Sequence, residues 1–171
     1  AGLGAAAQFG KMSVAYPALE FVYSGKSADG YPAQSAVAIG LILSVVGLVG
    51  LVFGTTAGLL VARIGEKRVI VAALALGAGV SAAQIPLPSY PMMILLRVLE
   101  GISHLAIVVV GPTMIAGLAA RRFQGAAMTL WSSFFGVAYA VLFYFGPQML
   151  LENGPQSLFV LHAAWMAVLA V

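Results

Sequence analysis

Long apolar segments without charge dominate the chain. Residues 36–62 and 69–85 contain no charged side chain, and the short connection between them carries Arg63, Lys67 and Arg68. A helix of about 20 apolar residues crosses the roughly 30 Å hydrocarbon core of a bilayer. The pattern therefore predicts two membrane-spanning helices that are joined by a short basic loop.

The same pattern continues along the rest of the chain. Apolar runs bounded by glycine, proline or charge predict six spans, at about residues 2–23, 36–62, 69–85, 92–120, 126–151 and 157–171. Strands would leave backbone groups unpaired in lipid, and the runs exceed the roughly ten residues of a membrane-barrel strand. We therefore expect an all-α membrane protein, a six-transmembrane-helix bundle. The chain starts without methionine and stops inside an apolar run, so we expect a fragment truncated at both ends.

The composition agrees with a chain embedded in lipid. Hydrophobic residues make up 62% of the 171 positions and charged residues 8%, and the mean hydropathy is +1.05. A water-soluble domain usually has about 25% charged residues. The sequence has no cysteine, which excludes disulfides and thiolate metal sites. It also lacks the P-loop, His-Glu-x-x-His and Gly-x-Ser-x-Gly motifs, so we expect neither an enzyme nor a bound cofactor.

Basic residues gather in two of the connections between the spans. The formal net charge is +3, and five of the eight Lys and Arg residues lie at positions 63–68 and 121–122. The other three connections hold one Lys, one Asp and one Glu between them. Because short basic loops stay on the cytoplasmic side, we expect both basic loops to be cytoplasmic, in a bacterial inner membrane. Orientation accounts for these residues, so no nucleic-acid partner is expected.

Small residues recur at every fourth position in two of the spans. These small-residue stripes are Gly50, Gly54 and Gly58 in the second span, and Ser132, Gly136 and Ala140 in the fifth. Small side chains let two helix backbones approach closely, which is a main source of attraction between helices in lipid. Two interpretations stay open: a tight structural contact, or a surface that rocks against a partner.

Two short motifs carry a resemblance to a known family. The loop pattern Gly-x-x-x-Asp-Arg-x-Gly-Arg-Lys is matched by Gly58, Arg63, Gly65 and Lys67, and the basic run continues with Arg68. Near the start of the fourth span, Arg97 and Gly101 match the pattern Arg-x-x-x-Gly. In these motifs the chain resembles the major facilitator superfamily of secondary transporters. The resemblance implies the amino-terminal six of twelve helices, with a second six-helix half as partner and a small molecule as substrate.

Two residues depart from the loop pattern of that family. Ala62 stands at its acidic position, and Glu66 replaces one of its basic residues. The charge relay that holds this loop against neighbouring helices is therefore expected to be altered, with Glu66 available to restore part of it. The departure keeps a second function open, an accessory or assembly subunit of a membrane complex that has the fold but transports nothing.

Three ionisable residues share one face of the fourth span. Arg97, Glu100 and His104 follow the spacing i, i+3 and i+7, which places them on one stripe of a helix. Ionisable groups at membrane depth are costly unless paired or hydrated, and they usually mark a pathway for substrate or protons. The alternative is a structural salt bridge between Arg97 and Glu100. His104 could relay protons together with Glu100, because imidazole titrates near neutral pH. Alternatively, it could serve only as a hydrogen-bonding partner between helices.

The first span carries one deep charge and one shallow charge. Lys11 lies near its middle and requires an anion, such as Glu100, or water. Glu20 lies near the outer end and projects to the opposite face, where we expect contact with water. Lys11 is therefore the pathway candidate of this span.

A pair of soft ligands occurs in the last span. His162 and Met166 lie four residues apart and could offer imidazole nitrogen and thioether sulfur to copper. Two ligands are too few for a metal site, and methionine is an ordinary packing residue in membrane helices. We therefore assign no metal site and keep a metal transporter as a weaker alternative.

The charges and the resemblance together suggest a function. We expect secondary active transport of a small solute by alternating access, with proton coupling through Glu100 as a hypothesis. Lys11 and Arg97 outnumber Glu100, which modestly favours an anionic or zwitterionic solute. Drug efflux is the alternative substrate class.

Overall fold

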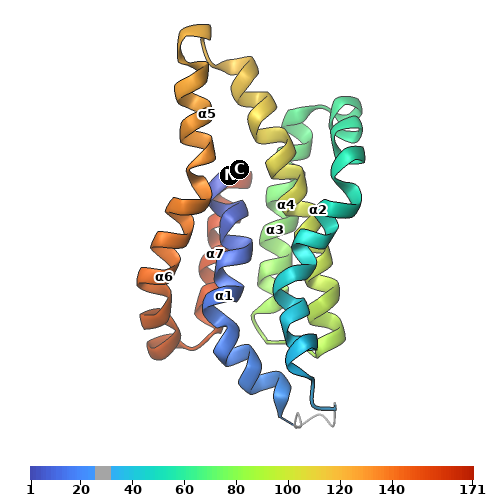
Figure 1. Cartoon of the computed structure of the whole chain (residues 1–171), viewed down its shortest axis with the longest axis vertical. Coiled ribbons are helices and arrows are strands. Elements are labelled where there is room, and N and C mark those ends of the chain that lie inside the picture. The colour runs from blue at the N-terminus through green and yellow to red at the C-terminus, as the bar shows by residue number, and fades with distance from the viewer. Residues whose placement is uncertain (26–31) are drawn as a thin grey trace.

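The computed structural model describes residues 1–25 and 32–171, which form a bundle of helices (Figure 1). Within these residues every regular element is a helix, so the predicted all-α fold is confirmed. The elements are α1 (Gly2–Ser24), α2 (Ala36–Ile64), α3 (Glu66–Gln84), α4 (Tyr90–Leu118), η1 (Arg121–Phe123), α5 (Gln124–Ser132), α6 (Phe134–Asn153) and α7 (Gln156–Ala170).

The fifth predicted span differs from the structure, because it is divided into α5 and α6 at Ser133. Two neighbouring hydroxyls donate to backbone carbonyls there: Ser132 Oγ to that of Met128 and Ser133 Oγ to that of Leu130. Serine hydroxyls that bond to preceding carbonyls compete with the helical ladder and bend it. The ladder is nevertheless bridged, since the Val137 N–H donates to Ser133 O over 3.0 Å. The two helices therefore act as one interrupted span.

Three of the described helical segments are long and apolar enough to cross a membrane: Ala36–Ile64, Tyr90–Leu118 and Arg121–Asn153. The other segments are less apolar or shorter. Helix α1 carries Gln8 and Lys11, α3 carries Ser81 and Gln84, and all four of these side chains are fully buried. These polar side chains point into the bundle, so a helix of lower hydropathy can still present an apolar surface to lipid.

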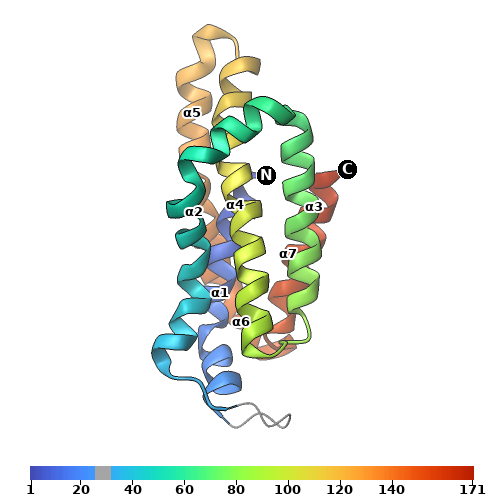
Figure 2. The same cartoon turned by 90° about the vertical axis from the view of Figure 1, so that its right-hand side faces the viewer.

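The connections between helices alternate between the two ends of the bundle (Figures 1 and 2). Residues 63–68, around the turn from α2 to α3, and residues 121–122, in η1, lie at one end. The α3–α4 and α6–α7 connections lie at the opposite end. The predicted connection at 25–34 lies partly outside the described residues, at 26–31. Both basic loops thus share one end, as the expectation of a common cytoplasmic side requires.

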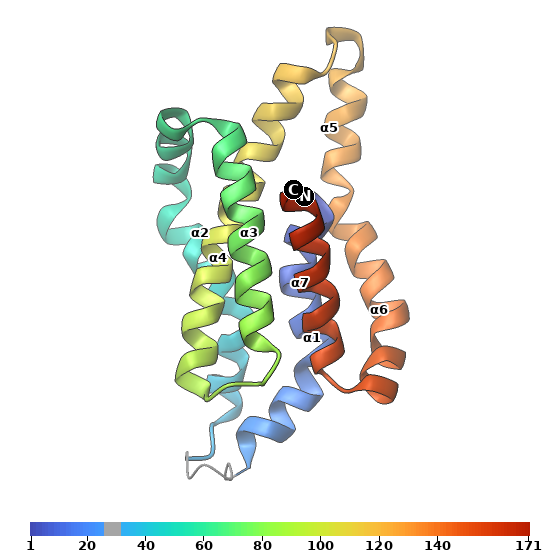
Figure 3. The ribbon, with the colours of Figure 1, turned by 180° about the vertical axis from the view of Figure 1, so that it is seen from behind.

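Two hydrophobic clusters pack the helices together. One includes Met12, Leu19, Ile42, Met93 and Phe159, and the other includes Ala6, Leu74, Ile107, Phe134 and Met166. Helix α7 lies beside α1 and α3 in the view from behind (Figure 3). Along α4, Arg97 and Glu100 fall between Met93 of the first cluster and Ile107 of the second. Apolar packing therefore borders these charges on both sides.

Gly101, the motif glycine of α4, allows close contact with α2. A Cβ atom at this position would lie 2.8 Å from Val49 Cγ2 and 3.2 Å from the Val46 Cα atom. That spacing is shorter than van der Waals contact, so a larger residue would push the two helices apart. The motif glycine therefore holds α4 against α2 next to Arg97.

Candidate functional site

Lys11 of α1 and Arg97 of α4 both bind the carboxylate of Glu100, and we call these three residues the charge cluster. Lys11 Nζ lies 2.6 Å from Glu100 Oε1, and Arg97 Nη1 lies 2.5 Å from Glu100 Oε2. All three side chains are 0% exposed. The anion that Lys11 requires is thus Glu100, and the Arg97–Glu100 salt bridge, which the sequence left as an alternative, is also formed. Glu20 is exposed.

Arg97 also fastens α4 to the backbone of two other helices. Its Nε donates to the carbonyl of Ile42 in α2 over 2.7 Å, and its Nη1 donates to the carbonyl of Gln8 in α1 over 2.9 Å. Its Nη2 has no hydrogen-bond partner among the described residues. Planar guanidinium groups can satisfy several acceptors in fixed directions, which a lysine cannot do. Arg97 therefore sets the relative position of α1, α2 and α4 around Glu100.

Polar residues of α3 complete the surroundings of the charge cluster. Gln84 Nε2 donates to Glu100 Oε2 over 2.9 Å, and Ser81 Oγ accepts from Lys11 Nζ over 2.6 Å. Both side chains are 0% exposed. Ser81 and Gln84 were not identified from the sequence alone. Their signal in the sequence is two polar residues three positions apart in an otherwise apolar span. On a helix, that spacing places them on one face.

His162 of α7 is a further residue of this site, and sequence reasoning considered it only as a copper ligand. Its Nε2 lies 3.1 Å from the carbonyl oxygen of Gly4, so this nitrogen carries a proton. Its Nδ1 lies 3.2 Å from Lys11 Nζ and 2.8 Å from Ser81 Oγ, where it can accept. This pattern fits a neutral imidazole that joins α7 to the charge cluster, with Glu100 Oε1 at 3.9 Å.

A second hydrogen-bonded chain begins at Gln8 of α1. Gln8 Nε2 donates to Ser103 Oγ over 3.0 Å, and Ser103 Oγ donates to the carbonyl of Ala73 over 2.7 Å. The Gln8 carbonyl is the one that accepts from Arg97. Gln8 thus connects the charge cluster to α3 and α4 at a level nearer the basic loops.

His104 does not join the charge cluster, although it shares a helical stripe with Glu100. Its Nδ1 lies 3.0 Å from the carbonyl oxygen of Ala5, and its ring packs edge-on against Phe9 with centroids 4.9 Å apart. One helical turn separates it from Glu100, and the carboxylate is directed toward Lys11 instead. Of the two interpretations of His104, the geometry matches a hydrogen-bonding partner between helices and does not assemble a relay with Glu100.

His162 and Met166, the pair of soft ligands in the last span, have other partners. Both ring nitrogens of His162 face protein groups, and Met166 is fully buried in the second hydrophobic cluster. Among the described residues there is no group of three or more His, Cys, Asp or Glu side chains that could hold a metal ion. The geometry therefore gives the copper alternative no support.

The loop motif between α2 and α3 is built around Gly65. This residue has φ +95° and ψ 137°, and its N–H donates to the carbonyl of Val61 over 2.9 Å. Positive φ is a region that glycine adopts without strain and other residues do not, which explains a glycine at this turn. Gly58, one helical turn before Ala62, faces open space. The sharp turn thus depends on Gly65 and not on Gly58.

The charges of the loop motif have no ion-pair partner within the described residues. Arg63, Lys67 and Arg68 are exposed, and Glu66 is half-buried. Glu66 therefore does not restore the altered charge relay through an ion pair with the described part of this half.

Comparison with protein families adds an independent finding. The chain matches the Major Facilitator Superfamily over residues 1–171. A search of curated proteins finds no match to the chain. The family match spans the whole helical bundle, the loop motif and the charge cluster, and the family consists of membrane transporters. The chain therefore belongs to the major facilitator superfamily.

Proposed function

We propose that the chain is the amino-terminal half of a secondary active transporter, which moves a small solute by alternating access across the cytoplasmic membrane of a bacterium. The observation that carries the proposal is the pairing of Lys11 on α1 with Glu100 on α4 over 2.6 Å. An ion pair between two helices changes strength when the helices move, so it can link solute binding to conformation.

The partner in this proposal is a second six-helix half, in the same polypeptide or another chain. The two small-residue stripes support it. A Cβ atom added at Gly50, Gly54, Gly58 or Gly136 would meet nothing within 4 Å, and Ser132 and Ala140 are exposed. These stripes do not pack within the described half, so they remain open for close contact with another helix. Alternating access would then be rocking of the two halves.

An anionic or zwitterionic substrate fits the charge cluster better than a cation does. Two cationic side chains share one carboxylate there, and all three are buried. Buried charge without full compensation favours a ligand of opposite sign. Transport confined to lipophilic cations, and unchanged by Lys11→Ala and Arg97→Ala, would instead favour drug efflux.

We further propose that Glu100 couples transport to protons. With Lys11 and Arg97 in contact, the ionised carboxylate is favoured, because each oxygen faces a cation. Separation of α1 from α4 would remove Lys11 and admit water, which would allow Glu100 to take up a proton. One proton could then be bound and released in each transport cycle.

Reconstitution of the protein in proteoliposomes tests the proposed transport. An imposed pH gradient should drive accumulation of a carboxylate solute above its equilibrium level, and dissipation of the gradient should stop it. A folded protein that moves no solute under any imposed ion gradient would favour the accessory-subunit alternative. Two observations keep this alternative: the loop-motif charges have no ion-pair partner in the described part of the chain, and position 62 is an alanine.

A further inference from the structure

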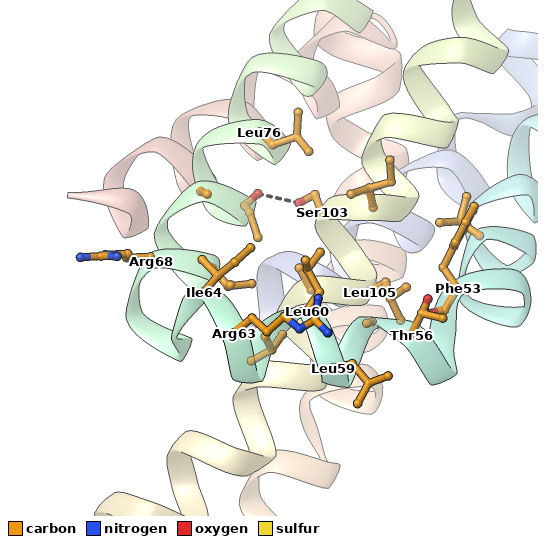
Figure 4. Close-up of a pocket in the computed structure, with 18 residues that line it drawn as sticks. Phe53, Thr56, Leu59, Leu60, Arg63, Ile64, Arg68, Leu76, Ser103 and Leu105 are labelled. Atoms are coloured by element: carbon orange, nitrogen blue, oxygen red, sulfur yellow. Dashed lines mark hydrogen bonds between the residues drawn. The ribbon is translucent and has the colours of Figure 1, made fainter.

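A cavity of about 630 Å³ lies between α2, α3 and α4, near the end of the bundle that holds the α2–α3 loop (Figure 4). Its walls are mainly apolar and include Val49, Phe53, Leu60, Leu76, Ile102 and Leu105. The size falls within the range of about 300–1,000 Å³ that is typical of sites for small organic ligands. None of the three charge-cluster residues lines it, so it is a separate site.

The hydroxyl groups of the cavity wall already have partners. Thr56 Oγ1 donates to the carbonyl of Phe53 over 3.0 Å, and Ser103 Oγ donates to that of Ala73 over 2.7 Å. A polar ligand in the deep part would therefore lose its hydration and gain few hydrogen bonds. The deep part suits a hydrocarbon chain.

Arginine is placed at the loop end of the same cavity. Arg63 lies beside Leu59 and Leu60 with its guanidinium directed back along the cavity, and Arg68 extends away from the other labelled residues (Figure 4). Both residues line the cavity, both are exposed, and neither has an ion-pair partner among the described residues. The cavity thus combines an apolar interior with a cationic rim.

We propose that this cavity binds one acyl chain of an anionic phospholipid, whose phosphate is bound by Arg63. The rim lies next to the connection between two membrane helices, which is the level of lipid headgroups, and arginine matches phosphate with a planar set of donors. A zwitterionic lipid would bring a cationic group toward the same arginine. A free phosphate would leave the apolar interior unused.

Native mass spectrometry of the detergent-solubilised protein tests this inference. Phosphatidylglycerol and phosphatidylcholine with identical acyl chains are titrated against wild type, and retained lipid is counted. We expect one tightly bound phosphatidylglycerol, weakened about fivefold by Arg63→Gln, since one basic residue near anionic lipid contributes about 1 kcal/mol. The control Arg121→Gln, a basic residue in the other loop at the same end, should leave the affinity unchanged.

A second pair of variants tests the acyl-chain part of the site. Ala57→Phe fills the cavity from α2 and should abolish the tight binding, whereas Val52→Phe, an exposed position on the same helix that does not line the cavity, should retain it. Phosphatidylglycerol with six-carbon chains should compete at least tenfold more weakly than the long-chain lipid, because each buried methylene contributes about 0.8 kcal/mol.

Lipid binding in this cavity does not depend on transport, and three results would overturn the proposal. These are equal retention of the two lipids by wild type, an equal loss in Arg63→Gln and Arg121→Gln, and undiminished binding in Ala57→Phe. Unfolding midpoints of the variants in lipid-free detergent separate loss of the site from loss of the fold.

Discussion

The charge cluster and the loop motif are both rich in charge, but the charged side chains are buried and paired in the first, whereas the basic side chains are exposed in the second. In the charge cluster one carboxylate binds two cations, and every side chain is 0% exposed. In the loop, Arg63, Lys67 and Arg68 are exposed and have no ion-pair partner among the described residues. Charged side chains inside the bundle must be paired within it. Charged side chains at the end of the bundle can instead contact lipid, water or another half. The two regions should therefore respond differently to mutation.

Removal of Glu100 should have the largest effect on stability. Glu100→Ala leaves Lys11 and Arg97 buried without their anion, and breaking a buried ion pair costs about 3–5 kcal/mol. Glu66→Ala, in the loop, should change the free energy of unfolding by no more than about 0.5 kcal/mol. Denaturant unfolding in micelles measures both, and equal effects of the two substitutions would remove the distinction between the two regions.

Substitution of the two motif glycines should also separate the regions. Gly101→Ala places a Cβ atom 2.8 Å from Val49 Cγ2, so we expect a loss of about 1–3 kcal/mol from overpacking. At Gly58 a Cβ atom meets nothing within 4 Å, and Gly58→Ala should raise stability by up to about 1 kcal/mol through helix propensity. Destabilisation by Gly58→Ala would show that this face is packed in the whole protein, for example by a second half. Thermal unfolding of the two variants provides the comparison.

A double-mutant cycle should resolve the Lys11–Glu100 contact itself. Lys11→Met and Glu100→Gln should be less harmful together than the sum of their separate effects, with a coupling energy of about 0.5–3 kcal/mol. The matched cycle of Arg63→Gln with Glu66→Gln should give a coupling close to zero, because these two residues form no ion pair in the structure. A zero coupling for the buried pair would contradict the 2.6 Å contact.

Substitution of Gly65 should destabilise the turn between α2 and α3. Gly65→Ala forces a residue with a side chain into φ +95°, which costs about 1–2 kcal/mol at a turn. The turn is at the end of the bundle, so some of this strain can relax. A stabilising effect in thermal unfolding would show that the turn does not require glycine.

Helix spacing and charge were enough to predict part of the site. Arg97 and Glu100 lie three residues apart on one helix, so their pairing follows from local geometry. The Lys11–Glu100 pair follows from the cost of an unpaired charge in lipid, given that Glu100 is the anion at comparable depth. These two contacts depend on rules that hold for any membrane helix.

Tertiary contacts account for what the sequence did not predict. His162 reaches Lys11 from 151 positions away, and nothing in the local pattern of α7 specifies that approach. His104 shares a stripe with Glu100, but its Nδ1 lies 3.0 Å from the carbonyl oxygen of Ala5 on another helix, and spacing within one helix cannot reveal that contact. The break at Ser133 depends on hydroxyl rotamers, which apolar periodicity does not encode.

Transport by the Glu100→Gln variant in proteoliposomes tests most directly whether the charge cluster couples protons to the solute. The variant keeps the shape of the side chain and removes its charge, and its folding is first verified by its unfolding midpoint. We predict that exchange of solute across the membrane persists, while accumulation driven by a pH gradient disappears. Accumulation equal to that of wild type in the folded variant would contradict the account and leave the charge cluster a structural ion pair.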